Sequence, residues 1–430
     1  MTTLDSQTDK SLCHLDKRSS TELTEIPSDH GLPVGISPME SRVAGHRLDT
    51  EGHTIGMLRR SDGRVFKPVV KPLLGKREIS FYENLQISRD PVMVQLKNYV
   101  PRYYGTTELQ IFGRRVTFLT LKDITDGMAE PCVMDIKIGR RTWDPLATPE
   151  KRATEELKYA ESKRTYGFCI TGFQVYCVSS GQLKQFGKHY GKTLDANGVV
   201  EALKIFLNIT PERPPCRQLV VKLLSILWRI LLFFRVQRMF RFYSSSLLVA
   251  YDAKRLRHYV RQNEANDASP SGQSRSFTST NTFKHVNDAT TSDSIPSDEI
   301  VRNRTMERVH FIKRSISLSS EYDSSGKEKS LNRSGSCSPD FRDGRLCRTH
   351  SYINNFDDDI VRMKEDYDDL LNELTSTSEE KQNWVRINMI DFTHVFPAED
   401  RNALDLNYLE GIENLIKLVE MFLVTKDTTA

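Results

Sequence analysis

The sequence predicts an α+β fold in two lobes, a small lobe rich in strands followed by a larger lobe that mixes strands and helices. The chain has 430 residues, which is more than one usual domain contains. Alternating apolar and polar residues dominate the part before Asp126, whereas strand and helix patterns are mixed after it. A long Ser-, Asn- and Asp-rich stretch interrupts this second part. The predicted segments are a disordered tail at 1–38, the small lobe at 39–125, the first part of the large lobe at 126–261, a disordered insertion at 262–381 and the second part of the large lobe at 382–430.

Composition and charge exclude several classes of protein. Hydrophobic residues make up 38% of the chain and charged residues 27%, as in ordinary globular proteins. A formal net charge of +4 is too small to imply nucleic-acid binding. The seven cysteines are scattered and odd in number, which argues against a disulfide framework and suits a reducing compartment. The polar first residues, MTTLDSQTDKSLCHLDKRSS, predict no secretion signal.

The small lobe is expected to begin with two strands, TIGMLRR and RVFKPVV, joined by a tight turn at Asp62-Gly63. In KREISFYENLQ, Ile79 and Leu85 lie at helical spacing with an aromatic residue between them, which predicts a helix with one apolar face. Alternating residues over 100–125 then predict further strands.

The large lobe mixes both patterns. PCVMDIKIG reads as a strand, and the charged segment at 148–164 predicts one helix, with Pro149 and Glu150 suited to its first turn. GFCITGFQVYCV and NWVRINMIDFTHVFP indicate strands, and GVVEALKIFL and the closing YLEGIENLIKLVEMFLV indicate amphipathic helices.

The most apolar run, Leu219 to Phe234, contains Lys222 and Arg229 and is shorter than the ~20 residues that span a bilayer. We expect a buried helix, with a membrane-surface helix as the alternative.

The insertion at 262–381 has few aliphatic residues to offset chain entropy, although IVRMKEDYDDLLNEL could form a short helix. Its segments RSISLSS and CRTHSY resemble basic-directed phosphorylation sites, so regulation and a plain linker both stay open.

PCVMDIKIG places a carboxylate and an ammonium group close together. Asp135 and Lys137 are two residues apart, and on an extended strand such positions project to the same face. Phosphoryl transfer needs positive charge near the transferring oxygens and carboxylates to hold metal or ribose, so the pair suits that chemistry. A structural ion pair would have the same spacing. The residues alone leave both interpretations open.

The segment resembles a known signature, and three further segments follow in the expected order. The Pro-x-x-x-Asp-x-Lys-x-Gly pattern of the inositol polyphosphate kinase family is matched by Pro131, Asp135, Lys137 and Gly139. SSLL at 245–248, MIDFTHVFP around Asp391, and the closing helix also resemble family segments. The matches extend from Val43 to Thr425. This resemblance implies a two-lobed kinase-like fold that binds ATP between the lobes and transfers its γ-phosphate to a hydroxyl of an inositol polyphosphate.

AGHRLDTEGHTIGML and Trp143-Asp144-Pro145 are most similar to the multikinase branch of the family. That branch implies phosphorylation of inositol trisphosphate and tetrakisphosphate toward the pentakisphosphate, with phosphatidylinositol bisphosphate as a further substrate. Trisphosphate 3-kinases and hexakisphosphate kinases share the signature and stay as alternatives. A non-catalytic inositol-phosphate-binding scaffold is the alternative of another class. A protein kinase is disfavoured, since we find neither its glycine-rich loop nor an HRD segment.

The resemblance also assigns ATP-binding roles. Lys67 matches the strand lysine that grips the phosphates, with Lys71 as a competing alignment, and Glu78 matches the glutamate that orients it. Ser245 and Ser246 are implied to face the triphosphate, with a packing role as the alternative.

LTLKDIT resembles the hinge between the lobes, where backbone groups of Lys122 and Ile124 would contact adenine. A glutamate is common where Lys122 stands, but backbone recognition would survive that change. Asp123 is implied to contact ribose or to fix the hinge, and a simple turn residue is the alternative. Asp135 is implied to accept hydrogen bonds from the ribose hydroxyls.

For catalysis, Lys137 is implied to bridge the transferred phosphoryl group and the substrate, and Asp391 to hold Mg²⁺ between the β- and γ-phosphates. No protein group has to act as general base, because a loose transition state asks chiefly for alignment and charge stabilisation.

Cations are expected around the inositol phosphate, because several phosphates are best bound by lysine and arginine. The family resemblance implies Lys137, Lys151 and His394 as substrate contacts, and Lys188 and Lys192 are further candidates. Thr154 and Glu155 stand where relatives often have glutamines, and Gln174 where some have arginine, so the preferred hydroxyl is open.

We expect inositol polyphosphates as partners, protein partners through the insertion, no nucleic acid, no transmembrane segment and a monomer. Residence in nucleus and cytoplasm is implied mainly by the resemblance, and VHFIKRS would permit nuclear entry.

Overall fold

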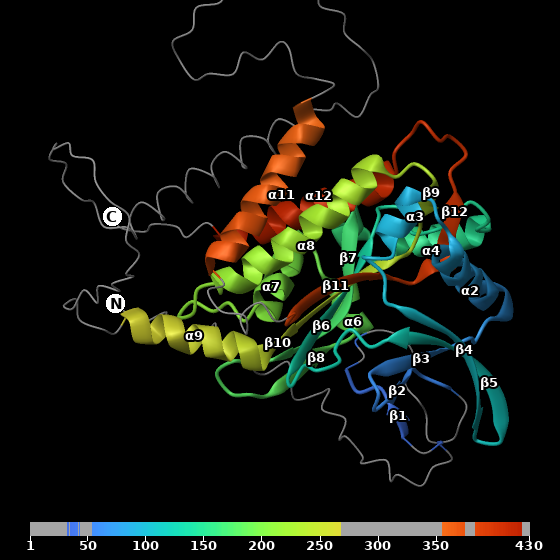
Figure 1. Ribbon diagram of the computed structural model, residues 1–430, viewed down its shortest axis with the longest axis horizontal. Helices are drawn as coiled ribbons and strands as arrows, with labels where there is room; N and C mark the ends of the chain where they lie inside the picture. Colours follow the sequence, from blue (N-terminus) through green and yellow to red (C-terminus); the bar gives the residue numbers. More distant parts are fainter. Residues whose placement is uncertain are drawn as a thin grey trace, which may run out of the picture.

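The computed structural model describes residues 32–33, 35–41, 43, 54–267, 355–374 and 383–423. They form two five-stranded antiparallel sheets with helices around them, so the predicted α+β class is confirmed (Figure 1). The small sheet has the order β1-β2-β3-β5-β4. Its strands are β1 (Ile36–Pro38), β2 (Leu58–Arg60), β3 (Arg64–Pro68), β4 (Tyr103–Ile111) and β5 (Arg114–Lys122).

The large sheet has the order β11-β10-β6-β7-β8, so strands from distant parts of the sequence are neighbours in it. Its strands are β6 (Pro131–Ile138), β7 (Phe168–Tyr176), β8 (Leu183–Phe186), β10 (Ser246–Asp252) and β11 (Val385–Ile390). A separate pair is formed by β9 (Phe240–Phe242) and β12 (Val395–Pro397).

The first hairpin of the small sheet forms as predicted, with β2 paired to β3 across Asp62-Gly63. Gly63 has φ +77°, and a Cβ there would lie 2.5 Å from Asp126 Oδ2, so both conformation and space demand glycine. The structure differs from the prediction further upstream. β1 lies within the predicted tail at 1–38, where Ile36 pairs with Arg60 and packs against a small apolar cluster.

Two helices connect β3 to β4. α2 (Pro72–Ile87) is the predicted amphipathic helix, and its buried face is formed by Glu78, Phe81, Tyr82 and Leu85. α3 (Pro91–Leu96) was not predicted, because six residues are too few to show a periodicity. Asp90 caps α3 by accepting the N–H groups of Val92 and Met93.

The two faces of the large sheet have different surroundings, because successive side chains on a strand point to opposite faces. On β6, Met134 and Ile136 belong to the main apolar core with the helices, and we call this the helix face. Val133, Asp135 and Lys137 lie on the other face, which we call the cleft face because Val133 there contacts the segment that leads in from the small sheet.

Helices cover the helix face of the large sheet, and Figure 1 shows α8, α11 and α12 running beside one another there. Their bounds are α7 (Ala196–Phe206), α8 (Arg217–Val236), α11 (Asn355–Leu374) and α12 (Leu406–Glu420). The other elements are α4 (Pro149–Leu157), α5 (Ala160–Tyr166), α6 (Lys188–Thr193), α9 (Ala253–Asp267) and the 3₁₀ turns η2 (Phe392–His394) and η3 (Met421–Leu423).

α8 contains the apolar run of the sequence, and the prediction of a buried helix is confirmed. The two cations that interrupt the run have protein partners: Lys222 lies 5.7 Å from the centroid of the Trp384 ring, and Arg229 forms an ion pair with Asp368 on α11 at 2.8 Å. Among the described residues no helix is both long and apolar enough to cross a bilayer.

The charged segment predicted as one helix over 148–164 is two short helices. Tyr159 separates α4 from α5 and has φ +55°, in the left-handed region that ends a helix. α4 has no buried residue, so no core contact forces it to continue into α5.

The helix that the sequence allowed at IVRMKEDYDDLLNEL forms as part of α11, so the predicted disordered insertion at 262–381 contains an ordered element. Met363, Tyr367 and Leu370 are buried in the main core, and Ser225 on α8 donates a hydrogen bond to Asp368 at 2.5 Å. The apolar residues are sparse but recur at i, i+4 and i+7, which is enough to bury one face.

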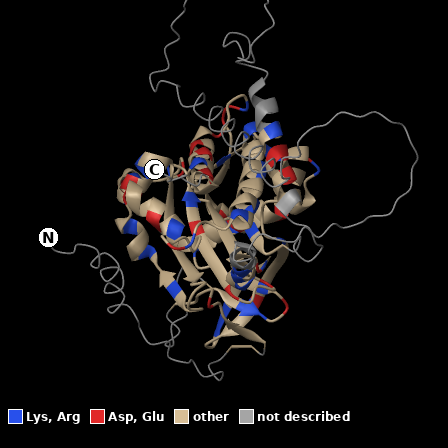
Figure 2. Ribbon diagram, turned by 90° about the vertical axis from the view of Figure 1, so that its left-hand side faces the viewer, with Lys and Arg blue, Asp and Glu red and all other residues tan. Residues whose placement is uncertain are grey.

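Charged residues of both signs are mixed along the described elements. Figure 2 shows Lys and Arg positions interspersed with Asp and Glu positions along the ribbon. This distribution agrees with the small formal net charge of +4.

The packing of α11 can be tested at Tyr367, which is 1% exposed, is stacked on Trp228 and donates a hydrogen bond to Glu420 at 3.1 Å. Tyr367→Ala is expected to lower the free energy of unfolding by about 3 kcal/mol, because it leaves a cavity in the core. Tyr367→Phe removes only the hydroxyl and should cost about 1 kcal/mol. Urea unfolding monitored by circular dichroism measures both, and equal stability of all three proteins would contradict the packing.

Candidate active site

Lys67 on β3 connects the two lobes at the candidate site. Its Nζ donates to Glu78 Oε1 on α2 at 2.8 Å and to Asp391 Oδ1, after β11, at 2.6 Å. Burial opposes its charge, but the carboxylates of Asp391 and Glu78 outweigh burial and hold the pKa of Lys67 well above its usual value. The competing candidate, Lys71, is an exposed residue at the N-cap of α2.

Asp391 has an unusual backbone that aims its carboxylate at Lys67. It has φ +65°, in the left-handed region that non-glycine residues rarely adopt and that often marks functional sites. Glu78 fixes the following turn, since Oε1 accepts the Phe392 N–H at 3.3 Å and Oε2 accepts the Thr393 hydroxyl at 3.4 Å. Burial raises the pKa of Asp391, but Lys67 and Lys137 outweigh it and lower that pKa below its usual value.

Asp135 and Lys137 share the cleft face, and no ion pair joins them in the described part of the chain. Lys137 Nζ instead donates to the carbonyl of Ser244 at 2.7 Å and to its hydroxyl at 2.9 Å. Ser244 has φ +59°, a second left-handed residue at this site. Burial and the neighbouring Asp391 raise the pKa of Asp135, with Lys137 opposing them. The structural ion pair that the sequence left open is therefore not formed.

The two serines of the SSLL segment do not share one environment. Ser246 is opposite Lys137 on one side and Ile390 on the other in the sheet register, so it lies on the cleft face. Ser245 precedes it, so its buried side chain points to the helix face, where it lies near the Tyr408 hydroxyl of α12. Only Ser246 joins the cleft group, while Ser244, which the sequence did not single out, contacts Lys137 directly.

The predicted hinge residues line a cavity of about 340 Å³. The Lys122 and Asp123 N–H groups donate to the carbonyls of Arg102 and Gly63, whereas no described residue accepts from the Ile124 N–H. The carboxylate of Asp123 accepts from both the N–H and the hydroxyl of Thr125 at 2.7 Å, so it fixes the hinge turn.

Apolar side chains continue from the hinge onto the cleft face. Ile124 forms a buried cluster with Val133 and Ala250, and Leu248 packs against it. Pro101 and Asn388 form further walls of the hinge cavity. A flat base would find apolar contacts here and a free backbone donor at Ile124.

His394 lies at the opposite end of the cleft from the hinge, at the end of η2. Its Nδ1 is 2.5 Å from Asp144 Oδ2, and the carboxylate of Asp144 is 4% exposed. Lys151 on α4 and Lys137 are close enough to disfavour the protonated ring electrostatically. Arg77 on α2 completes the group, 3.9 Å from Asp144 Oδ2.

Two predicted substrate lysines are not part of this group. Lys188 and Lys192 are exposed on α6, which packs against β7 and β8, and no hydrogen bond or ion pair among the described residues joins them to Lys137 or His394. The three departures from the family pattern have internal partners. The Thr154 hydroxyl donates to Glu150, Glu155 pairs with Lys158, and Gln174 donates to Pro131.

No local pattern points to Arg77 or Ser244, and Asp144 stands out only within the Trp143-Asp144-Pro145 resemblance. Arg77 lies next to the apolar face of α2, and Ser244 comes before the buried strand β10. In the sequence, a polar residue at either kind of position looks the same as an ordinary surface residue. The buried Asp144 followed by proline is the one position where local sequence could have drawn attention, since Asp-Pro favours a fixed turn.

Comparisons with known proteins show which family the chain resembles. A family model described as inositol polyphosphate kinase matches residues 118–420. Human inositol polyphosphate multikinase is 25% identical over 396 residues, covering 90% of this chain and 89% of the human protein. Human inositol hexakisphosphate kinase 2 is 32% identical over 203 residues, covering 45% of this chain and 47% of that protein. A crystal structure of the S. cerevisiae inositol phosphate multikinase Ipk2 with ADP and Mn²⁺ covers 84% of this chain and 99% of that chain, at 16% identity and a TM-score of 0.45.

Removing the lysine of the Glu78–Lys67–Asp391 group should change both stability and its pH dependence. Lys67→Met is expected to lower the free energy of unfolding at pH 7 by about 2 kcal/mol, because two carboxylates lose their shared cation. The loss should stay below the ~3–5 kcal/mol of fully buried pairs, since Lys67 and Asp391 are 26% and 39% exposed and partly screened.

The sign of the pH effect follows from Asp391, whose pKa Lys67 lowers. In the wild type this group stabilises the fold above the unfolded aspartate pKa of about 3.9, and that stability is lost as pH falls through the lower folded value. The difference between wild type and Lys67→Met should therefore narrow below about pH 4. Urea unfolding at a series of pH values measures it, with Lys71→Met as the exposed control. A difference that does not change with pH would contradict the assignment.

Proposed function

This chain belongs to the inositol polyphosphate kinase family, and we propose that it acts as a multikinase, phosphorylating inositol trisphosphate and tetrakisphosphate toward the pentakisphosphate with ATP as donor. The relative that covers 90% of the chain bears the multikinase name, whereas the hexakisphosphate kinase covers 45%. Each name describes the relative and not this chain. The greater coverage by the multikinase supports the multikinase proposal over the trisphosphate 3-kinase and hexakisphosphate kinase alternatives.

One observation carries the proposal: Lys67 of the small sheet and Lys137 of the large sheet both lie close to Asp391. Lys67 donates to Asp391, and both Lys67 and Lys137 lower the pKa of that carboxylate. Two cations and an acidic group at one point suit a transferring phosphoryl group, whose charge needs compensation in the transition state.

We assign ATP an orientation along this cleft. The base would lie at the hinge cavity, with the Ile124 N–H as donor and the cluster around Val133 as apolar contact. Asp135, whose Oδ1 is buried and accepts no hydrogen bond from the described residues, would accept from the ribose hydroxyls. The triphosphate would then reach Lys67, with Ser246 beside it.

Asp391 fits a role in holding Mg²⁺. Magnesium is commonly bound through one or two carboxylates together with phosphate oxygens and water. The described residues contain no cluster of three or more His, Cys, Asp or Glu that would bind a metal without such help. When bound, the ion would neutralise charge on the β- and γ-phosphates. Lys67 meanwhile holds one Asp391 oxygen in place.

The acceptor would bind beyond Lys137, where Lys151 and His394 lie. Lys188 and Lys192 are exposed on α6 and would add charge to the approach of a polyanion rather than contact the reacting phosphate. We extend the proposal to phosphatidylinositol bisphosphate as a substrate, to protein partners bound through the insertion, to a monomeric state and to residence in nucleus and cytoplasm, as the family resemblance implies.

The activity can be tested with purified protein, Mg²⁺-ATP and a panel of inositol tris-, tetrakis- and hexakisphosphates, with products separated by anion exchange. A multikinase converts the trisphosphate stepwise to the pentakisphosphate. If phosphorylation of the trisphosphate stops at the tetrakisphosphate, the result favours a trisphosphate 3-kinase. If the protein makes only pyrophosphates, and only from the hexakisphosphate, the result favours a hexakisphosphate kinase. If no acceptor gains phosphate, the proposal fails.

Lys137→Ala and Asp391→Asn are each expected to lower kcat at least about a hundredfold, the scale of losing one electrostatic catalytic group. Unfolding midpoints should show that both variants remain folded. Lys204→Ala, which removes a lysine of α7 that pairs with the exposed Glu201, serves as the control and should keep the wild-type rate. Near-wild-type rates for both site variants would show that the roles are misassigned.

A further inference from the structure

His394 and Asp144 form a buried pair that the charge-compensation account of catalysis leaves unused. The His394 ring lies three residues after Asp391, and its Nδ1 is 2.5 Å from Asp144 Oδ2. The histidine side chain is 18% exposed and the carboxylate 4%, so the ring has limited access to solvent while its partner has almost none.

Asp144 cannot turn away from the ring. Its Oδ1 accepts the Leu146 N–H at 2.9 Å, which leaves Oδ2 for the histidine, and Arg77 lies 3.9 Å away. A carboxylate only accepts hydrogen bonds, so Nδ1 of the neutral ring must carry the hydrogen. Nε2 then has a free lone pair, and no described residue hydrogen-bonds to it.

The charges around the ring keep it neutral. Burial lowers the pKa of His394 below its usual value, and Lys151 on α4 and Lys137 on β6 act in the same direction. Asp144 opposes them but does not reverse the shift. Of the other charged groups nearby, Arg77 on α2 faces the Asp144 carboxylate, and Asp391 lies at the start of the same turn. A neutral ring close to neutral pH is able to accept a proton.

We propose that Nε2 of His394 is the general base that takes the proton of the acceptor hydroxyl, and that Asp144 is the positioning residue that holds the ring in the required tautomer. This inference rests on the proposed kinase function. The hydroxyl oxygen forms a bond to the γ-phosphorus of ATP, and the bond from that phosphorus to the bridging oxygen breaks, its electron pair leaving with ADP. The hydroxyl proton passes to Nε2 and later to solvent.

We expect His394 to make only a modest contribution to kcat as the general base. General bases add ~10²–10⁴ to enzymatic rates, but a loose phosphoryl transition state places little demand on the base. We therefore expect His394→Gln to lower kcat by roughly 10- to 100-fold, at the low end of that range. Binding of ATP should not change, because the pair contacts neither the hinge cavity nor Lys67.

Asp144→Asn tests the positioning role through the tautomer. The Leu146 N–H needs an oxygen opposite it, so the amide nitrogen would take the place of Oδ2 and donate to Nδ1. The neutral ring would then carry its hydrogen on Nε2 and could no longer accept a proton. We expect kcat to fall by roughly 10-fold or more, as for a lost base, with the KM for ATP unchanged.

The pH profile separates a base from a structural contact. Wild-type kcat should decline at acidic pH as His394 becomes protonated, and the midpoint should lie below the ordinary histidine pKa of about 6.5. That decline should be missing in His394→Gln and in Asp144→Asn. All proteins are assayed with the same inositol trisphosphate and ATP, so titration of the substrate phosphates contributes equally to every profile.

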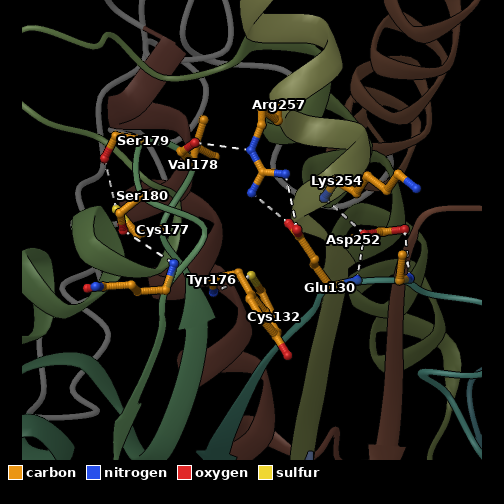
Figure 3. Close-up of polar contacts among 12 residues, drawn as sticks. Glu130, Cys132, Tyr176, Cys177, Val178, Ser179, Ser180, Asp252, Lys254 and Arg257 are labelled. Atoms are coloured by element: carbon orange, nitrogen blue, oxygen red, sulfur yellow. Dashed lines mark hydrogen bonds and ion pairs between the residues drawn. The ribbon is translucent and has the colours of Figure 1, made fainter.

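Asp252 provides the matched control for the asparagine substitution. Like Asp144 it is a buried carboxylate that fixes a loop, accepting the N–H groups of Ala129, Glu130 and Lys254 at 3.0–3.1 Å (Figure 3). It contacts no histidine, so Asp252→Asn should keep both the rate and the acid decline of the wild type.

The outcomes distinguish this inference from the proposed function. An inactive wild type would end the kinase proposal itself. If the wild type is active and His394→Gln shows the same decline of kcat at acidic pH, His394 is not the general base. The same conclusion follows if the variants keep the wild-type kcat. If Asp144→Asn loses rate equally at every pH and keeps the acid decline, its role is structural and the positioning inference is overturned.

Discussion

The cleft of this protein depends on one lysine shared by two carboxylates. Lys67 comes from the small sheet, Glu78 from α2 and Asp391 from the end of β11, 324 positions further along the chain than the lysine. Placing two carboxylates together in a partly buried site is unfavourable unless a cation lies between them. An apolar contact also joins the two lobes here, because Phe81 of α2 stacks on Phe392 with ring centroids 4.3 Å apart. The lobes therefore meet at the point where phosphoryl chemistry would occur.

Backbone conformation and sheet geometry aim the remaining groups at this point. The alternation of side chains along β6 brings Asp135 and Lys137 to the cleft face while their neighbours enter the core. Ser244 and Asp391 both adopt left-handed conformations next to this face, at a cost of about 1–3 kcal/mol each. The surrounding core has to offset that strain, and the well-buried helices α8 and α12 provide it. α11 extends the same core with a helix from within the long insertion.

The site divides its work between electrostatic and apolar regions. The hinge end combines polar cavity walls with the apolar cluster around Ile124, whose N–H has no acceptor among the described residues, and this combination suits a base. The other end concentrates Lys67, Lys137 and Lys151 near Asp391 and His394, so charge on one group shifts the proton affinity of the next. The pKa of Asp391 is lowered and that of Asp135 is raised, although Lys137 lowers the pKa of both carboxylates. Lys67 accounts for this contrast, because, of these two carboxylates, it hydrogen-bonds that of Asp391.

Local patterns in the sequence were sufficient for the α+β class, the Asp62-Gly63 hairpin, the amphipathic α2 and the buried α8, because each depends on the spacing of apolar residues or on one turn. The family followed from the signature at Pro131 to Gly139. Other features were decided by contacts between distant residues. Tyr159 interrupts a helix whose α4 part has no core contact, and α11 orders within a polar insertion because α8 offers it an apolar face. Ser245 and Ser246 are adjacent in sequence, yet only the sheet register decides which one faces the cleft. Asp144 and His394 are 250 positions apart, and no local pattern can reveal such a pair. The sequence by itself determined the elements and their chemistry, and the tertiary structure decided which charged groups meet.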